Sequence, residues 1–379
     1  MGELMRRYWH PVGLSSYATE LPRKVRALRE DLILFRDGAG RPGLVHPRCC
    51  HRGSSLFYGK VEEDGIRCCY HGWKFAVDGH CLERPAEPNP GPVKAVRQPW
   101  YPVEERYGLI WAYMGPPERK PLLPRYNVFE ELDEGDQLWT DDQNIGAGTW
   151  EPHVPFNWLQ HYENIHDVAH FFWLHYLHSG PQFGERFGEI DLVAMRRNLP
   201  QMVQSVVYEV NERGLTARRQ HALPDGRILR SIVETAMPTL RVVPNPFGRA
   251  GRVDHIGFVL PVDDTHFSIF TVLRGPDRGF FDFFTQLRTR EDGKSAEERQ
   301  RFPGDLEAQG SQGPITLHSE EHLGSSDKAI VMLRRLFEEQ IAIVEQGGDP
   351  IGVHFASGSE YVRLEGGSFI GEPTPAPFG

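Results

Sequence analysis

The chain has 379 residues, enough for two domains of ordinary size, and its 39% hydrophobic and 11% aromatic content is typical of a globular protein. The net charge of -10 argues against a nucleic acid as partner, because phosphates would be repelled, and no stretch approaches the roughly 18 apolar residues of a membrane span. The five cysteines are clustered, unlike a secreted disulfide framework, and the N-terminal sequence lacks the apolar core of a signal peptide, so we expect a cytoplasmic protein without a membrane partner.

The first part of the chain, from Lys24 to about Met114, is predicted to consist of short strands and turns. Residues 25–36 are strand-like and lead into a Gly-rich turn, and Asp78-Gly79 is a hairpin signal. Residues 104–115 are typical of one further strand that ends at Gly115. The Pro-rich connector "PPERKPLLP" follows and predicts a domain boundary. We therefore predict domains at 1–118 and 119–379, of which the first is all-β.

The second part mixes helices and strands. Residues 157–178 have helical length, and 326–346 show helical apolar spacing, with Ser326 as the expected cap and a Gly-Gly stop. Strands are expected at residues 202–210, 214–223, 227–238, 254–262 and 266–275. This order predicts an α+β domain.

Four of the five cysteines lie in doublets at 49–50 and 68–69, which the histidines His51 and His71 follow. As ligands, these residues give C-x-H, sixteen residues, and then C-x-x-H. Two thiolates and two imidazoles on facing turns can hold either a tetrahedral Zn²⁺ or a two-iron cluster of the Rieske type. Spacing alone does not decide between the two.

The residues that flank these histidines resemble those of the Rieske domains of non-haem iron oxygenases. "HRG" contains the first histidine and "YHGW" the second, small Gly53 and Gly72 let the loops close, and Trp73 can shield a cluster. This resemblance implies a [2Fe-2S] cluster rather than a structural zinc.

One cysteine of each doublet is assigned as a cluster ligand. Cys50 is adjacent to a histidine and cannot easily bind with it at one centre, and Cys69 is one residue too close to the second histidine. The predicted ligands are therefore Cys49 and Cys68, together with His51 and His71. Cys50 and Cys69 are expected to be small buried side chains, and Cys81 is expected in the core.

A second group of candidate ligands lies in residues 161–178, which hold five histidines. His166 with His170, or His175 with His178, could bind a metal by helical spacing. His170 and His175 form H-x(4)-H, and on an ideal helix they differ by about 140°. A break or π-bulge would be needed to make them converge. The residues alone leave this choice open.

The segment "ENIHDVAHFFWLH" resembles the D-x-x-H-x(4)-H signature of the Rieske oxygenase catalytic domain. The resemblance implies an all-β Rieske domain followed by an α+β catalytic domain with an antiparallel, helix-grip-like sheet. It makes His170 and His175 ligands of a mononuclear Fe(II), completed by one carboxylate. His166 and His178 are then not ligands.

The third iron ligand must be an acidic residue of the C-terminal half. Generic candidates are Asp305, Glu307, Glu320, Glu321, Asp327 and Glu345. The stretch 304–335 resembles the phthalate-dioxygenase branch of the family and places the ligand at Asp305, with Gln309, Ser311 and Gly313 following it. Asp327 is expected to be a first-turn acid of the last helix.

Asp167 is given a separate role by the resemblance. In this family the corresponding residue links the two metal centres, because its carboxylate accepts hydrogen bonds from a Rieske histidine (here His71) and from an iron-bound histidine (here His170). The link runs between neighbouring subunits of a trimer, so we expect a homotrimer.

The resemblance implies the oxygenase component of a Rieske system, which uses O₂ to hydroxylate a small aromatic substrate, with an aromatic acid favoured. O-demethylation of a methoxy-aromatic acid needs the same ligands and stays open. No G-x-G-x-x-G follows a strand, so electrons must come from a separate NAD(P)H-dependent reductase or ferredoxin. Candidates for binding a substrate carboxylate, each expected to be an exposed strand residue instead, are Arg196, Arg218, Arg230 and Arg241.

Two other classes of protein remain possible. An electron-transfer Rieske protein would need no second metal site, and the D-x-x-H-x(4)-H run therefore counts against it. A zinc-stabilised binding module is disfavoured by the paired "HRG" and "YHGW" sequences.

Overall fold

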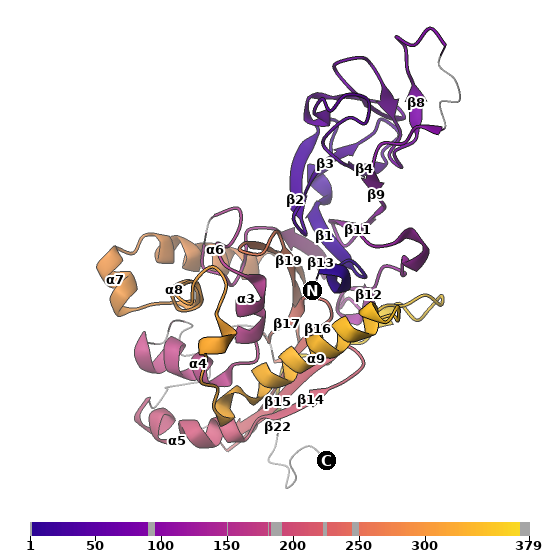
Figure 1. Cartoon of the computed structure of the whole chain (residues 1–379). Coiled ribbons are helices and arrows are strands. Elements are labelled where there is room, and N and C mark those ends of the chain that lie inside the picture. The colour runs from indigo at the N-terminus through magenta and orange to yellow at the C-terminus, as the bar shows by residue number, and fades with distance from the viewer. Residues whose placement is uncertain are drawn as a thin grey trace.

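The computed structural model describes residues 2–89, 95–149, 151–180, 182, 192–222, 226–244 and 250–371. The N-terminal strands form one end of the molecule, and a large sheet with helices forms the other (Figure 1). Among the described residues, no helix combines the length and apolarity needed to cross a membrane. The predicted fold class, an all-β domain followed by an α+β domain with an antiparallel sheet, is confirmed.

The N-terminal region contains three small sheets, with strand orders β1-β11-β10, β2-β3-β4-β9 and β5-β6-β7-β8. The strands are β1 (Trp9–Leu14), β2 (Arg23–Ala27), β3 (Glu30–Arg36), β4 (Pro42–Val45), β5 (Lys60–Glu62), β6 (Gly65–Arg67), β7 (Lys74–Phe75), β8 (Cys81–Glu83), β9 (Trp100–Tyr101), β10 (Val103–Arg106) and β11 (Leu109–Tyr113). Short helical turns accompany them at α1 (Gly2–Met5), η1 (Ser15–Tyr17) and η2 (Leu56–Tyr58). The predicted Asp78-Gly79 turn joins β7 to β8, and Gly79 has a positive φ of 79°.

Two segments predicted as single strands are hairpins. Residues 25–36 turn at Leu28 and Arg29, which have φ of 48° and 70°, and residues 104–115 turn at Tyr107, with φ of 56°. Non-glycine residues rarely adopt positive φ, so Leu28 and Arg29 carry no turn signal. The second turn does carry one, since Gly108 follows Tyr107 with a φ of 74°. The first turn is held by tertiary contacts, because the main-chain nitrogen of Leu28 donates to the carbonyl of Pro261 at 2.9 Å.

The large sheet has the path β13-β20-β19-β17-β16-β15-β14, with β22 on β16 and β18 on β22. Its strands are β13 (Gln137–Asp141), β14 (Val207–Val210), β15 (Gly214–Ala222), β16 (Ile228–Ala236), β17 (Leu240–Val242), β18 (Gly251–Arg252), β19 (His255–Pro261), β20 (Phe267–Gly275) and β22 (Gly367–Gly371). A separate parallel pair consists of β12 (Arg125–Tyr126) and β21 (Tyr361–Val362). The predicted strand 202–210 is only half correct, since its first residues end helix α5 (Leu192–Gln204).

Strands β19 and β20 are buried on both faces along almost their whole length, which explains their largely apolar sequence. In β19, Ile256 and Phe258 pack toward β1 and β11, where Trp111 meets Phe258 edge-to-face at 4.9 Å between ring centroids. Val259 points the other way, into the core beneath the helices. The N-terminal sheet thus packs directly on the large sheet, and the division at 118/119 stays a prediction.

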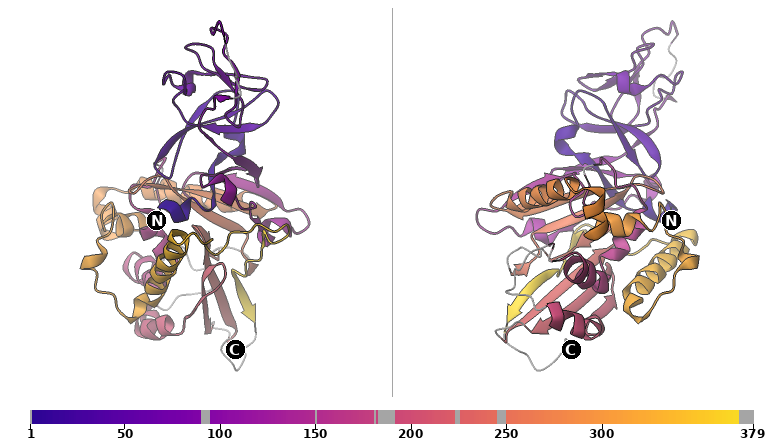
Figure 2. Two further views of the ribbon diagram at one scale, coloured as in Figure 1. Left: turned by 45° about the vertical axis from the view of Figure 1, so that its right-hand side comes forward. Right: turned by 90° about the vertical axis from the view of Figure 1, so that its left-hand side faces the viewer.

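The helices α3 and α9 lie against one face of the large sheet (Figures 1 and 2). The helical elements of this part are η4 (Pro117–Arg119), α2 (Asn127–Glu130), α3 (Trp158–Asn164), α4 (Val168–Phe172), the π-helix η5 (Trp173–His178), α6 (Gly279–Asp292), α7 (Ala296–Arg301), α8 (Asp305–Gly310), η6 (His318–Glu320), η7 (Ser325–Asp327) and α9 (Lys328–Glu345). The predicted cap at Ser326 is wrong. Gly324 begins the preceding turn, and its main-chain nitrogen donates to the Asp327 carboxylate at 2.7 Å.

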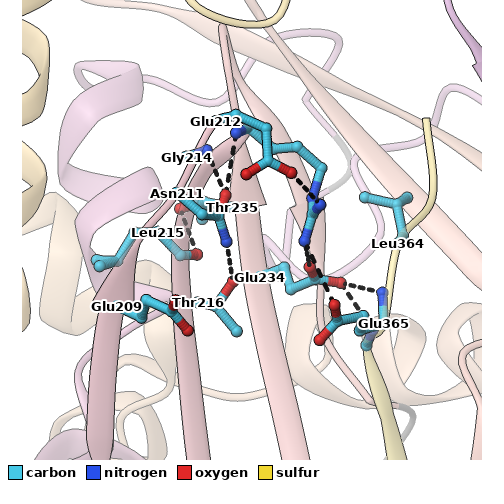
Figure 3. A network of polar contacts seen from close by, with 12 residues as sticks. Glu209, Asn211, Glu212, Gly214, Leu215, Thr216, Glu234, Thr235, Leu364 and Glu365 are labelled. Atoms are coloured by element: carbon cyan, nitrogen blue, oxygen red, sulfur yellow. Dashed lines mark hydrogen bonds and ion pairs between the residues drawn. The ribbon is translucent and has the colours of Figure 1, made fainter.

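The C-terminal strand β22 is fastened to the sheet by a polar network around Glu234 (Figure 3). The Glu234 carboxylate accepts hydrogen bonds from the main-chain nitrogens of Glu365 and Gly366, both at 2.7 Å. Burial raises the pKa of Glu234, and these two hydrogen bonds act in the opposite direction. The network holds the residues before β22 beside β16. Ser368 of β22 and Leu229, Ser231 and Val233 of β16 then line the cavity described below.

An ion pair joins α9 to α3, the helix that leads into the metal-binding segment. Arg334 donates to both carboxylate oxygens of Glu163 at 2.6 and 2.8 Å, with side chains 17% and 10% exposed. Arg334→Met leaves the largely buried Glu163 carboxylate without its arginine partner. We therefore expect the free energy of unfolding to fall by about 3 kcal/mol in urea denaturation. The matched control is exposed Arg335→Met, which should leave stability unchanged. Equal stability of both variants would contradict this prediction.

Candidate metal centres

Two loops of the N-terminal region are built alike. The main-chain nitrogen of Cys49 donates to Ser54, and that of Gly53 donates back to Cys49, both at 2.8 Å. In the second loop Cys68 donates to Trp73 at 2.8 Å and Gly72 donates back to Cys68 at 3.2 Å. Gly53 and Gly72 have positive φ of 78° and 73°, as a residue closing such a tight turn requires. Each turn therefore presents one cysteine and one histidine.

The loops bring the four predicted cluster residues together. Cys49 and Cys68 are both 3% exposed and lie in contact, and the rings of His51 and His71 are 4.6 Å apart. Trp73 stacks on His51 with ring centroids 4.4 Å apart and planes 2° from parallel. This position is compatible with the predicted role of Trp73 in shielding a cluster. Burial, together with the neighbouring Cys68 thiol, raises the pKa of Cys49 to about 12. Buried thiolates need a cationic partner, so this donor set fits an iron–sulfur cluster.

The prediction that Cys50 and Cys69 are buried is wrong, since both are exposed. In a tight turn the residue after the inward-facing cysteine points outward. The main-chain nitrogen of Cys50 donates to the Gln98 side chain at 2.8 Å, and the Cys69 sulfur lies 3.8 Å from Ser54 Oγ. Cys81 is 3% exposed and belongs to the core, as expected.

The histidine-rich segment contains the predicted irregularity. Helix α3 ends at Asn164, the Asp167 carboxylate caps α4 by accepting from the main-chain nitrogen of His170 at 3.0 Å, and the chain then widens into the π-helix η5. The wider helix turns His175 toward His170, and their ring centroids are 5.4 Å apart. His166 is buried and bonds Thr235 at 2.9 Å, away from this pair.

Asp305 is the carboxylate that meets the two histidines. It is the first residue of α8, and its Oδ2 lies 3.3 Å from His175 Nε2 while its Oδ1 lies 3.6 Å from His170 Nε2. One ligand atom from each of the three residues falls within 4.8 Å of the others, so this group can hold a single metal ion. Burial would raise the pKa of Asp305, but interaction with His175 and His170 lowers it below the usual range.

Both histidines have Nε2 on the side of Asp305 and Nδ1 against an oxygen of the chain. His170 Nδ1 lies 2.5 Å from the carbonyl oxygen of Asp167, and His175 Nδ1 lies 2.6 Å from Oε1 of Gln182. Each of these oxygens can only accept, so Nδ1 carries the proton and Nε2 carries the lone pair that a metal would take. On His170 this lone pair accepts from Asn164 Nδ2 at 3.1 Å. Gln182 is held in turn by donating to the Pro303 carbonyl at 3.0 Å, which connects it to the segment before Asp305.

The contact between Asp167 and His170 differs in one atom from the expected one. His170 Nδ1 donates its hydrogen bond to the main-chain oxygen of Asp167 and not to its carboxylate. The nearest carboxylate oxygen of Asp167 is 3.8 Å from Nδ1. The carboxylate caps α4 and is 25% exposed, so part of it faces solvent.

A cavity of about 360 Å³ opens beside the three residues. Its lining is mostly apolar and includes Phe171, Met195, Leu229, Val233, Phe280 and Phe284. Three arginines also line it: Arg219, Arg241 and Arg299, the last of which pairs with Glu307 at 2.8 Å. An apolar cavity of this size with few polar groups is typical of a site for a small organic ligand.

The arginine candidates from the sequence are distributed differently from what was expected. Arg241 is half-buried and lines the cavity, whereas Arg218 pairs with Glu209 and Glu365 at 2.8 and 2.6 Å. Sequence reasoning missed Arg219. The alternation of strand β15 would have found it, because Ala217 and Arg219 share the pocket face while Arg218 faces away.

The fold and these two centres define the class of protein, a Rieske protein with a second metal site, and comparisons with known proteins agree. Residues 8–102 match the model of the Rieske [2Fe-2S] domain. The chain is 46% identical to the phenoxybenzoate dioxygenase subunit alpha of Ectopseudomonas oleovorans over 97% of this chain and 88% of that protein. It is 35% identical to the tert-butanol monooxygenase / tert-amyl alcohol desaturase oxygenase subunit of Aquincola tertiaricarbonis, over 99% and 78%.

Two further comparisons place the chain within the family. Identity to the phthalate 4,5-dioxygenase oxygenase subunit of Pseudomonas putida is 30% over 93% of this chain and 85% of that one. The structure superposes on a mutant of NdmA from Pseudomonas putida CBB5, solved with caffeine, with a TM-score of 0.64 at 20% identity, over 92% and 93% of the chains, which shows the shared fold.

The chain belongs to the Rieske non-haem iron oxygenases and is an oxygenase component of the phthalate-dioxygenase-like branch. Its cofactors are a Rieske [2Fe-2S] cluster and a mononuclear iron. Electron transfer by a Rieske domain alone, or a zinc-stabilised module, is thereby set aside.

Proposed function

We propose that this oxygenase hydroxylates a small aromatic acid. Cys49, His51, Cys68 and His71 would hold the cluster, and His170, His175 and Asp305 the mononuclear iron. When bound, these groups supply stored electrons and O₂ activation. The chain itself fixes the two histidine tautomers and places an apolar cavity beside the open side of the iron ligands.

The observation that carries the proposed substrate class is the unpaired guanidinium of Arg219. It lines the cavity over the rings of Phe171 and Phe172, at 5.3 and 6.0 Å from their centroids, and has no hydrogen-bonded or carboxylate partner among the described residues. Burial lowers the pKa of Arg219, because it disfavours the charged form. A desolvated cation is stabilised by an anionic ligand, and an arginine can bind a carboxylate with two hydrogen bonds.

Arg219 also stands at a suitable place for this role. Phe171 separates it from the iron site, since the Phe171 and His175 rings are 6.0 Å apart. An aromatic acid anchored by its carboxylate at Arg219 would therefore extend its ring along Phe171 toward the iron ligands. The relative named for phenoxybenzoate supports the same class of substrate.

Electron supply and assembly complete the proposal. A separate NAD(P)H-dependent reductase or ferredoxin would reduce the cluster, and Asp167 would pass the electron from His71 of a neighbouring subunit to His170 in a homotrimer. The partly exposed Asp167 carboxylate supports this arrangement. The arrangement of the molecule supports it too, because the N-terminal strands up to β8 and helix α4 lie at opposite ends of the molecule (Figure 1). We place the protein in cytoplasmic catabolism of aromatic compounds, in keeping with its unpaired, clustered cysteines.

The proposed substrate class is tested with the isomers of phenoxybenzoate, benzoate and methoxybenzoates, each beside its primary amide, using a surrogate reductase. We expect turnover of one or more acids, with the amides much poorer, and the product distinguishes ring hydroxylation from O-demethylation. Equal turnover of acids and amides would contradict an acidic substrate.

Arg219→Met is expected to raise KM for the acid about tenfold to a hundredfold, because a charged hydrogen bond contributes about 1.5–3 kcal/mol. Arg219→Lys should recover part of this loss. The matched control is Arg218→Met on the other face of the same strand, which should leave KM unchanged. If Arg219→Met and the wild type share one KM, Arg219 does not bind the carboxylate.

A further inference from the structure

A row of hydrogen-bonded side chains, of which the two middle ones are buried, leads from Arg241 to the proposed iron ligand Asp305. Arg241 Nη1 lies 3.1 Å from His161 Nε2, His161 Nδ1 lies 3.2 Å from Gln309 Oε1, and Gln309 Nε2 lies 3.2 Å from Asp305 Oδ1. His161 is 3% exposed and Gln309 is 2% exposed. The row therefore exchanges little with water.

The direction of every hydrogen bond in this row is determined by chemistry. A guanidinium can only donate, so His161 Nε2 accepts and its proton must lie on Nδ1. Nδ1 then donates to Gln309, whose amide is thereby oriented with its NH₂ group toward Asp305. The carboxylate can only accept, and the row ends there.

The row is built into the fold rather than formed by mobile side chains. The guanidinium of Arg241 also donates to the carbonyl of Ile145, and a Cβ at Gly257 would lie 2.3 Å from Arg241 Nε, so only glycine leaves room for it. Phe267 stacks on His161 with centroids 5.1 Å apart. Burial and the neighbouring Arg241 lower the pKa of His161 to about 3, so the ring is neutral at working pH and can accept at one nitrogen while donating at the other.

Asp305 is thereby held at one of its two oxygens. Oδ1 accepts from Gln309 and also from Asn164 Nδ2 at 3.1 Å, whereas Oδ2 is the oxygen 3.3 Å from His175 Nε2. We propose that Arg241, His161 and Gln309 act as positioning residues, whose directed hydrogen bonds fix the orientation in which Asp305 binds the metal. This inference rests on the proposed role of Asp305 as an iron ligand.

The test measures metal binding, independently of turnover. The full chain with its cluster assembled is depleted of mononuclear iron with a chelator and titrated anaerobically with Co(II) in equilibrium dialysis. His161→Phe, which keeps the stacking on Phe267, is expected to bind Co(II) about tenfold to a hundredfold more weakly, the usual effect of losing an outer partner of a ligand. Gln309→Met should show the same loss, and the double variant should be no weaker than the weaker single one, because both changes break one row.

The matched control is His166→Phe, a second buried histidine of the same segment, which bonds Thr235 and not Asp305. It should leave Co(II) affinity unchanged. Unchanged affinity in His161→Phe, an equal loss in His166→Phe, or additive losses in the double variant would each overturn the proposal. Asp305→Ala distinguishes failure of the proposed iron ligand from failure of the positioning role. If this variant still binds Co(II), Asp305 is not a ligand. If this variant loses Co(II) while His161→Phe and Gln309→Met bind it normally, only the positioning role fails.

Discussion

Replacing Asp305 by Ala is expected to abolish turnover while leaving the Rieske cluster intact. Among the described residues, Asp305 is the carboxylate that meets His170 and His175, and its loss leaves two neutral imidazoles, which hold Fe(II) poorly. Iron should fall from about three to about two per chain, with two acid-labile sulfides in both proteins. The measurement is iron and sulfide analysis of anaerobically purified protein, together with the cluster spectrum.

The matched control for this variant is Glu320→Gln. Glu320 was an equally generic ligand candidate in the sequence, but it lies exposed in η6 and belongs to no ligand cluster among the described residues. It should retain all iron and full turnover. If Asp305→Ala keeps a third iron after Fe(II) has been added and removed by desalting, another carboxylate completes the site.

Asp167→Asn is expected to lower turnover about a hundredfold, with both metal centres assembled, as for loss of an outer partner that a metal centre depends on. Asparagine caps a helix about as well as aspartate, so the hydrogen bond from the main-chain nitrogen of His170 is retained and α4 stays in place. What the variant removes is the negative charge available to a second histidine. The reductase should still reduce the cluster at the normal rate, and single-turnover product formation from the reduced protein should be lost.

The inter-subunit path can be tested by complementation. A His71→Ala chain lacks a complete cluster but keeps Asp167, and an Asp167→Asn chain has a cluster but no bridge. Each alone should be nearly inactive. Co-expressed mixed oligomers should recover activity if the bridge runs between subunits, and they should stay inactive if it runs within one chain. Normal turnover of Asp167→Asn alone would remove the bridging role altogether.

The cluster loops were the most predictable part of this protein. Cys49 with His51 and Cys68 with His71 each lie in a tight turn of a few residues, so sequence spacing alone determines which side chains each loop presents. The break in the histidine-rich segment followed from spacing only after the family resemblance had selected His170 and His175, because H-x(4)-H cannot converge on a regular helix. The structure places a π-helix there.

Features that depend on distant parts of the chain were not predictable to the same degree. The turn at Leu28 is held by hydrogen bonds to the end of β19, and nothing in its own residues signals it. The outward direction of Cys50 follows from the loop closing over its neighbour. Helix α5 was missed because the apolar residues around Met202 fit a strand as well as the end of a helix.

The sequence by itself therefore determined the ligand types, their local spacing and the fold class, because these are written in short segments and in apolar periodicity. Residue spacing left several carboxylates open as the third ligand, and the family resemblance favoured Asp305. The tertiary structure brings Asp305 to the two histidines, because α8 returns it from well over a hundred residues away. It also decided the charge inside the pocket. Arg219 and Arg241 lie in strands, and which face of a strand is buried depends on what packs against it.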